Sequence, residues 1–83
     1  MAETTGLVQR LTVLNSTLTC VWIGPTPNNT TLLIVTNDGS DPDSAFAANL
    51  IQTLAAATTN YRVVAADHAD NDSKITSIRV DPV

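Results

Sequence analysis

Basic residues are scarce in this sequence, and they do not cluster. Four Lys and Arg residues stand against eight Asp and Glu among 83 positions, which gives a formal net charge of −4. Proteins that bind nucleic acids or anionic membranes neutralise phosphates with grouped Lys and Arg side chains. We therefore expect neither nucleic acid nor an anionic membrane surface as a partner.

Cysteine is also scarce, and long apolar runs are missing. Cys20 is the single cysteine, so no disulfide can form within the chain, and the apolar run Leu18–Ile23 around it predicts a buried thiol. No apolar run approaches the ~20 residues that cross a bilayer. The first residues lack the basic start and apolar core of a secretory signal. We expect a cytoplasmic protein without membrane insertion, or a secreted one only if a leader has been removed.

Residues suited to catalysis or metal binding are few. His68 is the only histidine, and it stands in a polar run with Asp67, Asp70 and Asp72. A calcium loop needs a glycine for its sharp bend and a closing bidentate acid, whereas Lys74 follows here. A zinc site needs several Cys, His or carboxylate ligands, and one His without partner cysteines is too few. The run reads better as a solvated turn, and we predict no enzyme, no metal and no cofactor.

What the sequence does contain is a single domain, residues 1–83, with residues 1–6 as a flexible N-terminus. Alternation of apolar and polar residues and β-branched composition predict strands. A loop rich in Pro and Gly, Gly24–Asn29, separates the second strand from the third. Asp41 is the predicted helix N-cap, with Pro42 in the first turn. The expected strands span 7–14, 17–23, 30–36, 61–66 and 74–80, and the expected helix spans 44–59.

The order of these elements is βββαββ, which leaves two architectures open. One is a mainly β (α+β) domain, an OB-like five-stranded β-barrel with one helix between strands 3 and 4. The other is an open antiparallel sheet with the helix across one face. A helix long enough to span a barrel end favours the closed barrel.

The predicted helix, Ser44–Thr59, contains no charged residue. A helix on the surface of a small monomer normally has a charged outer face. We therefore expect a second cover from another copy of the chain, which makes the protein a homo-oligomer. One stripe of the helix, Phe46, Leu50, Leu54 and Ala57, is predicted to face the core, and the neighbouring stripe, Ala47, Ile51, Ala55 and Thr58, to form the oligomer interface.

A resemblance follows from the second half of the chain. The helix from Ser44-Ala45-Phe46 to Leu54 precedes Arg62-Val63-Val64, a polar turn and Lys74-Ile75-Thr76-Ser77-Ile78. In this order of elements the chain resembles the B subunits of the pentameric bacterial toxins, the cholera-like and subtilase-like families. The resemblance implies an OB-fold that closes into a ring of five, with strands paired across each subunit boundary and helices lining the pore.

Trp22 is the residue best suited to hold a ligand. An exposed Trp packs against the apolar faces of sugar rings, and Asn and Thr side chains bond hydroxyl groups. Asn28, Asn29 and Thr30 follow closely, and His68 lies in the other long turn, so these five residues are the candidate ligand-binding set. The alternative is that Trp22 packs in the core or at a subunit boundary.

The sequence therefore predicts a non-catalytic, ring-forming binding module, lectin-like or specific for a small polar ligand. A glycan or small polar ligand would be its partner, besides further copies of itself. The alternative is a structural or assembly protein, whose homo-oligomer scaffolds a partner chain.

Overall fold

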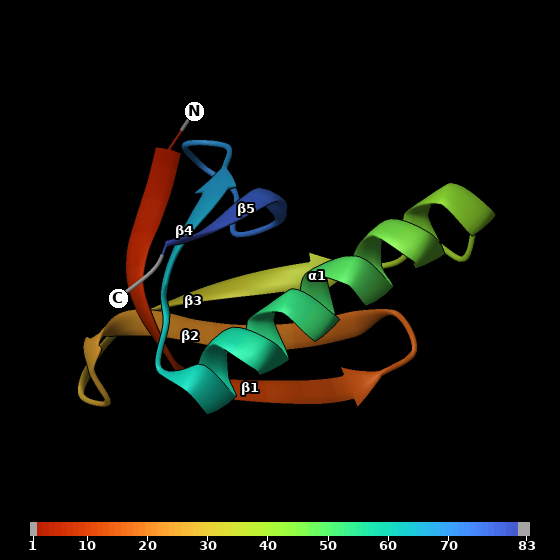
Figure 1. Cartoon of the computed structure of the whole chain (residues 1–83). Coiled ribbons are helices and arrows are strands. Elements are labelled where there is room, and N and C mark those ends of the chain that lie inside the picture. The colour runs from red at the N-terminus through yellow and green to blue at the C-terminus, as the bar shows by residue number, and fades with distance from the viewer. Residues whose placement is uncertain (1, 82–83) are drawn as a thin grey trace.

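The computed structural model describes residues 2–81, which form five strands and one helix (Figure 1). The predicted type and order of all six elements, βββαββ, are confirmed. The elements are β1 (Ala2–Asn15), β2 (Leu18–Thr26), β3 (Asn29–Thr36), α1 (Asp41–Asn60), β4 (Val63–His68) and β5 (Ile75–Asp81).

The five strands form one antiparallel sheet in the order β3-β2-β1-β4-β5. The central strand β1 is long and bent, so that its two halves run in different directions (Figure 1). Its first half, Ala2–Leu7, pairs with β4, and its second half, from Leu7 to Asn15, pairs with β2. One strand therefore joins the β2–β3 hairpin to the β4–β5 hairpin.

The sheet is not closed into a barrel, which corrects the prediction of an OB-like β-barrel. Among residues 2–81, the edge strands meet at one parallel bridge between Ile34 and Lys74, where the amide nitrogen of Ile34 donates to the carbonyl oxygen of Ser73 at 2.8 Å. Beyond this bridge α1 contacts both β3 and β5. The helix occupies the space in which further hydrogen bonds between the two edges would have closed the barrel. The architecture is the open α+β sheet with a helix over one face.

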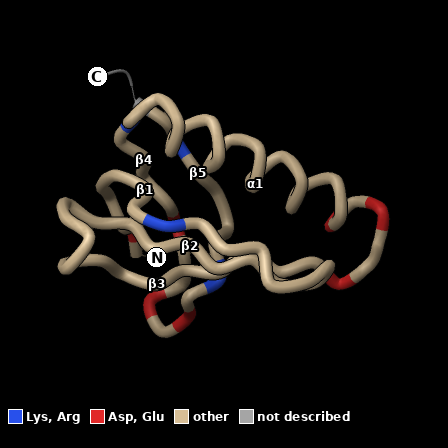
Figure 2. The backbone as a smooth tube through the Cα atoms, turned by 90° about the horizontal axis from the view of Figure 1, so that it is seen from below, with Lys and Arg blue, Asp and Glu red and all other residues tan. Residues whose placement is uncertain are grey.

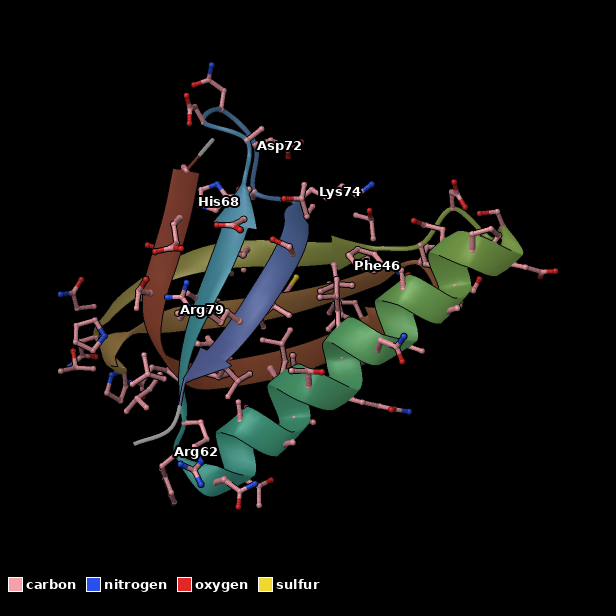
Figure 3. The ribbon with its side chains drawn as sticks, turned by 45° about the horizontal axis from the view of Figure 1, so that its top comes forward. Phe46, Arg62, His68, Asp72, Lys74 and Arg79 are labelled. Carbon is pink, nitrogen blue, oxygen red and sulfur yellow. The ribbon has the colours of Figure 1, made fainter. Side chains whose placement is uncertain are left out.

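The core lies between this face of the sheet and α1. Leu50, Leu54 and Ala57 are buried in it, as predicted, but Phe46 is 42 % exposed. Phe46 lies toward the N-terminal end of α1 (Figure 3), beside the buried stripe that Ala47, Leu50, Leu54 and Ala57 form. The core residues of the strands are Val8, Val21, Ile23, Leu33, Val35, Val64, Ala66 and Ile75.

The N-cap of α1 is Ser40 rather than the predicted Asp41. The hydroxyl oxygen of Ser40 accepts a hydrogen bond from the amide of Asp43 at 3.4 Å, and Ser40 has the extended backbone of an N-cap. Asp41 therefore becomes the first helical residue, where its negative charge favours the helix dipole. Hydrogen bonds from the Ser40 side chain and amide hold the pKa of Asp38 below its usual value.

The C-terminus of α1 is capped by its own residues. The side chains of Thr58, Thr59 and Asn60 each donate to the carbonyl oxygen four positions earlier, at 2.7, 3.1 and 2.8 Å. The amide of Arg62 donates to the carbonyl of Ala57 at 3.0 Å. The chain leaves the helix at Tyr61 in the left-handed conformation, with φ 54° and ψ 45°. The last turn thus needs no basic side chain to satisfy its carbonyl groups.

Two segments are more regular than the sequence predicts. The segment 2–6, predicted to be flexible, is paired from Ala2 to Gly6 with β4, which adds backbone hydrogen bonds that the composition alone does not indicate. The predicted loop Gly24–Asn29 shortens to a turn at Pro27 and Asn28, since β2 continues to Thr26 and β3 begins at residue 29. The register of the β2–β3 pair shifts between residues 23 and 26. Pro25, which has no amide hydrogen to donate, therefore lies at an irregular point of this ladder.

Gly24 permits this tight hairpin. A Cβ atom at this position would lie 2.0 Å from the carbonyl oxygen of Asn29, and one at Gly6 would lie 2.9 Å from the Cα of Gly24. The backbones of β1, β2 and β3 therefore approach closely at a point where side chains have no room.

Candidate functional site

A hollow of about 300 Å³ lies where the second half of β1, β2 and the β2–β3 turn meet. This volume is at the lower end of the range of small-molecule sites, roughly 300–1,000 Å³. The hollow is lined by Gln9 and Arg10 of β1, Trp22 of β2, Pro27 of the turn and Thr30 of β3. It therefore combines an aromatic ring, a guanidinium group, an amide and a hydroxyl.

The register of the β1–β2 pair places Arg10 opposite Trp22. Its guanidinium carbon lies over the indole ring, 5.5 Å from the ring centroid. A cation in this position is attracted by the negative face of the ring. Within the part of the chain that the structure describes, no carboxylate forms an ion pair with Arg10. The edge of the guanidinium remains a donor that a ligand can use.

Gln9 fixes the floor of the hollow. A register shift between Val8 and Arg10 marks an irregularity in β1 at this residue. The side-chain amide of Gln9 donates to the carbonyl oxygen of Gly24 at 2.9 Å, which ties β1 to the start of the β2–β3 hairpin. Irregular positions of this kind re-aim side chains in a strand. Gln9 and Arg10 can therefore both contribute to one site, although they follow each other in sequence.

The structure brings together two of the five predicted ligand residues. Trp22 and Thr30 line the hollow, whereas Asn28 and Asn29 are exposed beside it at the β2–β3 turn. Sequence reasoning missed Arg10. Counting back from the Asn15–Leu18 pair would bring position 11 opposite Trp22, and the register shift between Val13 and Asn15 brings Arg10 there instead.

His68 lies at the other end of β1, where β4 ends, and close to the β4–β5 turn with Asp72 (Figure 3). Its Nδ1 lies 3.0 Å from the carbonyl oxygens of Ala69 and Asp72, which can only accept, so Nδ1 carries the proton. Its Nε2 and the hydroxyl oxygen of Thr4 lie 2.9 Å apart and form a hydrogen bond. Both ring nitrogens are engaged in holding the turn, and the structure does not place His68 at the Trp22 hollow.

The acidic side chains of this turn are engaged in similar contacts. Asp67 accepts from the hydroxyl of Ser77 at 2.7 Å, and Asp72 accepts from the amide of Lys74 at 3.0 Å. Among residues 2–81, no three His, Cys, Asp or Glu side chains converge as metal ligands would. Cys20 carries a free thiol, half-buried rather than fully buried as predicted, because it alternates with the buried Thr19 and Val21 in β2.

The helix stripe predicted to form the oligomer interface is divided in the structure. Ala47 is 4 % exposed and packs in the core of its own chain, while Ile51 and Thr58 are half-buried. Ala55 is exposed. The exposed face of α1 lies to one side of the predicted stripe, and that self-association occurs at all stays a prediction.

Comparison with known proteins gives no relative: no family model, no curated protein and no solved structure matches this chain. The resemblance to the toxin B subunits thus depends on the βββαββ order alone. As for membranes, none of the described residues belongs to a helix with the length and apolar character needed to span a bilayer.

Proposed function

We propose that this protein is a non-catalytic binding module that takes a small polar ligand with a carboxylate group in the Trp22 hollow. The observation that carries the proposal is the guanidinium of Arg10, stacked 5.5 Å from the indole centroid at the margin of a hollow of about 300 Å³. Arg presents paired N–H donors that match the two oxygens of a carboxylate.

The remaining lining supports a ligand with both apolar and hydroxyl-bearing parts. Trp22 and Pro27 offer apolar surface, and the hydroxyl of Thr30 can donate to or accept from a ligand hydroxyl. A carboxylate-bearing sugar combines these features, which keeps the lectin-like function as the first choice. The toxin-like order of elements agrees with a binding role, because the resemblance is to subunits that bind rather than to catalytic ones.

The experiment that tests this proposal uses the intrinsic fluorescence of the only tryptophan in the chain. Purified protein is titrated with glucuronate, galacturonate, glucose, citrate and inorganic phosphate. Saturable quenching or a spectral shift with the carboxylates, and none with glucose, is expected. Removal of a charged hydrogen-bonding partner costs about 1.5–3 kcal/mol, so Arg10→Gln is expected to weaken binding by roughly tenfold or more.

Lys74→Gln is the matched control, because it removes a positive charge at the start of β5, outside the hollow. Its binding constant is expected to equal that of the unmodified protein. A flat titration with every compound, or equal weakening by Arg10→Gln and Lys74→Gln, would contradict the proposed site.

The second candidate function is that of a structural or assembly protein. It is favoured by the outer face of α1, which carries no charge from Ser44 to Asn60. A protein of this kind would form a defined oligomer and show no fluorescence response to any ligand of the panel. The two functions are therefore separated by the same titration combined with a mass measurement.

A further inference from the structure

The outer face of α1 is exposed along the whole helix, yet it consists of small and neutral side chains. A helix that faces water normally carries charges on this side. Small residues let a second helix approach to about 8 Å between axes, the short end of the usual range. The exposed residues of this face are Ala45, Ala48, Asn49, Gln52, Ala55, Ala56 and Thr59.

A hollow of about 430 Å³, largely apolar, lies beside the C-terminal half of α1, between the helix and the end of β5. Thr53, Ala56, Asn60 and Val80 line it, together with Arg62. The exposed ring of Phe46 belongs to the same flank of the helix, because it precedes Thr53 by seven positions, close to two full turns. The helix thus presents an exposed aromatic ring near one end and an apolar hollow near the other.

Charges of opposite sign mark the two ends of α1 (Figure 2). Asp41 and Asp43 stand in its first turn, and Arg62 lies two positions after its last residue, at the opposite end of the helix from Phe46 (Figure 3). These side-chain charges are opposite in sign to the helix dipole, which is positive at the N-terminus and negative at the C-terminus. Two such helices attract each other when they lie antiparallel, since acidic and basic ends then meet.

We propose that two copies of the chain pair through the outer faces of α1, antiparallel about a two-fold axis at Gln52, so that the exposed Ala45 and Asn49 of each cover the 430 Å³ hollow of the other. In this register position 45 comes opposite position 59, and position 49 comes opposite position 55, next to Ala56 of the hollow. Position 44 comes opposite position 60, the last of the helix, so Asp41 extends past the end of the partner's helix toward the partner's Arg62. The interface is self-complementary, as a two-fold requires.

This pairing differs from the interface predicted from the sequence in two ways. Its centre is Gln52 rather than Ile51 and the buried Ala47, and it produces a dimer in place of a ring of five. It is also independent of the proposed ligand, because the Trp22 hollow lies on β1, β2 and the β2–β3 turn and not on α1.

Mass measurement over a range of concentrations is the first test. Light scattering after size-exclusion chromatography is expected to give twice the mass of one chain, and Gln52→Glu, which places two negative charges on the axis, is expected to give the mass of one. Thr31→Glu adds the same charge at an exposed position of β3 and is expected to leave the dimer intact. A single-chain mass for the unmodified protein at millimolar concentration, or a five-chain mass, would overturn the proposal.

Cross-linking tests the axis itself. In a Cys20→Ala background, Gln52→Cys supplies the only thiol, and mild oxidation is expected to convert it into a covalent dimer on a non-reducing gel. Thr31→Cys in the same background is expected to stay uncoupled under the same oxidant. Equal coupling of the two variants would reject a two-fold at position 52.

A charge exchange tests the ends of the interface. The two-fold symmetry repeats the exposed pair of Asp41 and Arg62 at both ends of the interface, so each substitution removes two ion pairs. Asp41→Arg and Arg62→Asp are therefore each expected to raise the dissociation constant of the dimer by roughly threefold to tenfold. The double variant restores both pairs and is expected to return the constant close to its original value. Additive weakening in the double variant would show that these two residues do not meet.

Discussion

Replacing Tyr61 by glycine is expected to stabilise the fold. Tyr61 follows α1 with φ 54° and ψ 45°, the only non-glycine residue with positive φ among residues 2–81. A side chain in this left-handed conformation costs about 1–2 kcal/mol through the contact of Cβ with the following carbonyl. Glycine avoids that contact and is the commonest residue at this position after a helix.

The magnitude of the gain follows from three contributions. The Tyr61 ring is 77 % exposed, so its removal forfeits little buried area. The greater freedom of glycine in the unfolded chain offsets about 0.5–1 kcal/mol of the relieved strain. The net gain is then about 0.5–1 kcal/mol, which in a domain of this size raises the Tm by roughly 2–8 °C.

Urea unfolding followed by circular dichroism, at one fixed protein concentration, measures this gain. Tyr61→Ala is the matched control, because alanine also lacks the ring but retains the Cβ atom. The glycine variant is expected to be more stable than both the alanine variant and the unmodified protein. If Tyr61→Gly proved no more stable than Tyr61→Ala, backbone strain would not be the dominant effect at this position.

Three further predictions concern stability. Leu54→Ala, at a fully buried position of α1, is expected to lower the free energy of unfolding by about 2–5 kcal/mol in urea titrations, and a loss below 1 kcal/mol would mean that the core collapses around the cavity. Gly24→Ala is expected to cost about 3 kcal/mol and to abolish ligand-induced fluorescence changes, because its Cβ would meet the backbone oxygen of Asn29. The lowered pKa of Asp38 makes its ionised form stabilising above the unfolded value of 3.8 and progressively less so as the pH falls through the folded pKa. Asp38→Asn is therefore expected to flatten the loss of stability below pH 4, and an unchanged acid-unfolding profile would contradict this role.

Local signals were sufficient to predict the type and order of every element, although not the first half of β1. The alternation in the first strand, the β-branched third strand and the Pro and Asp residues before the helix all report on neighbours close in sequence. Closure of the barrel is a different kind of property. It depends on whether α1 packs against both β3 and β5, and no local sequence pattern gives the distance between the two edges of a sheet.

The candidate site was only half predictable for a related reason. Trp22 and Thr30 are recognisable by residue type, but Arg10 enters the site through the register of β1 against β2. The face of the helix that stays uncovered was misjudged because Ala47 and Ala55 look alike in sequence. Their environments differ because the sheet covers one and not the other.

The shared central strand imposes an order on folding. Pairs within the β1–β2–β3 meander join residues that are near each other in sequence, whereas residue 2 pairs with residue 68 across most of the chain. Contacts between distant segments form slowly, because a long loop must be closed before any of them is made. A ribosome must therefore have synthesised the chain past His68 before the first half of β1 can pair with all of β4, and until then that edge of the nascent meander remains open to other chains.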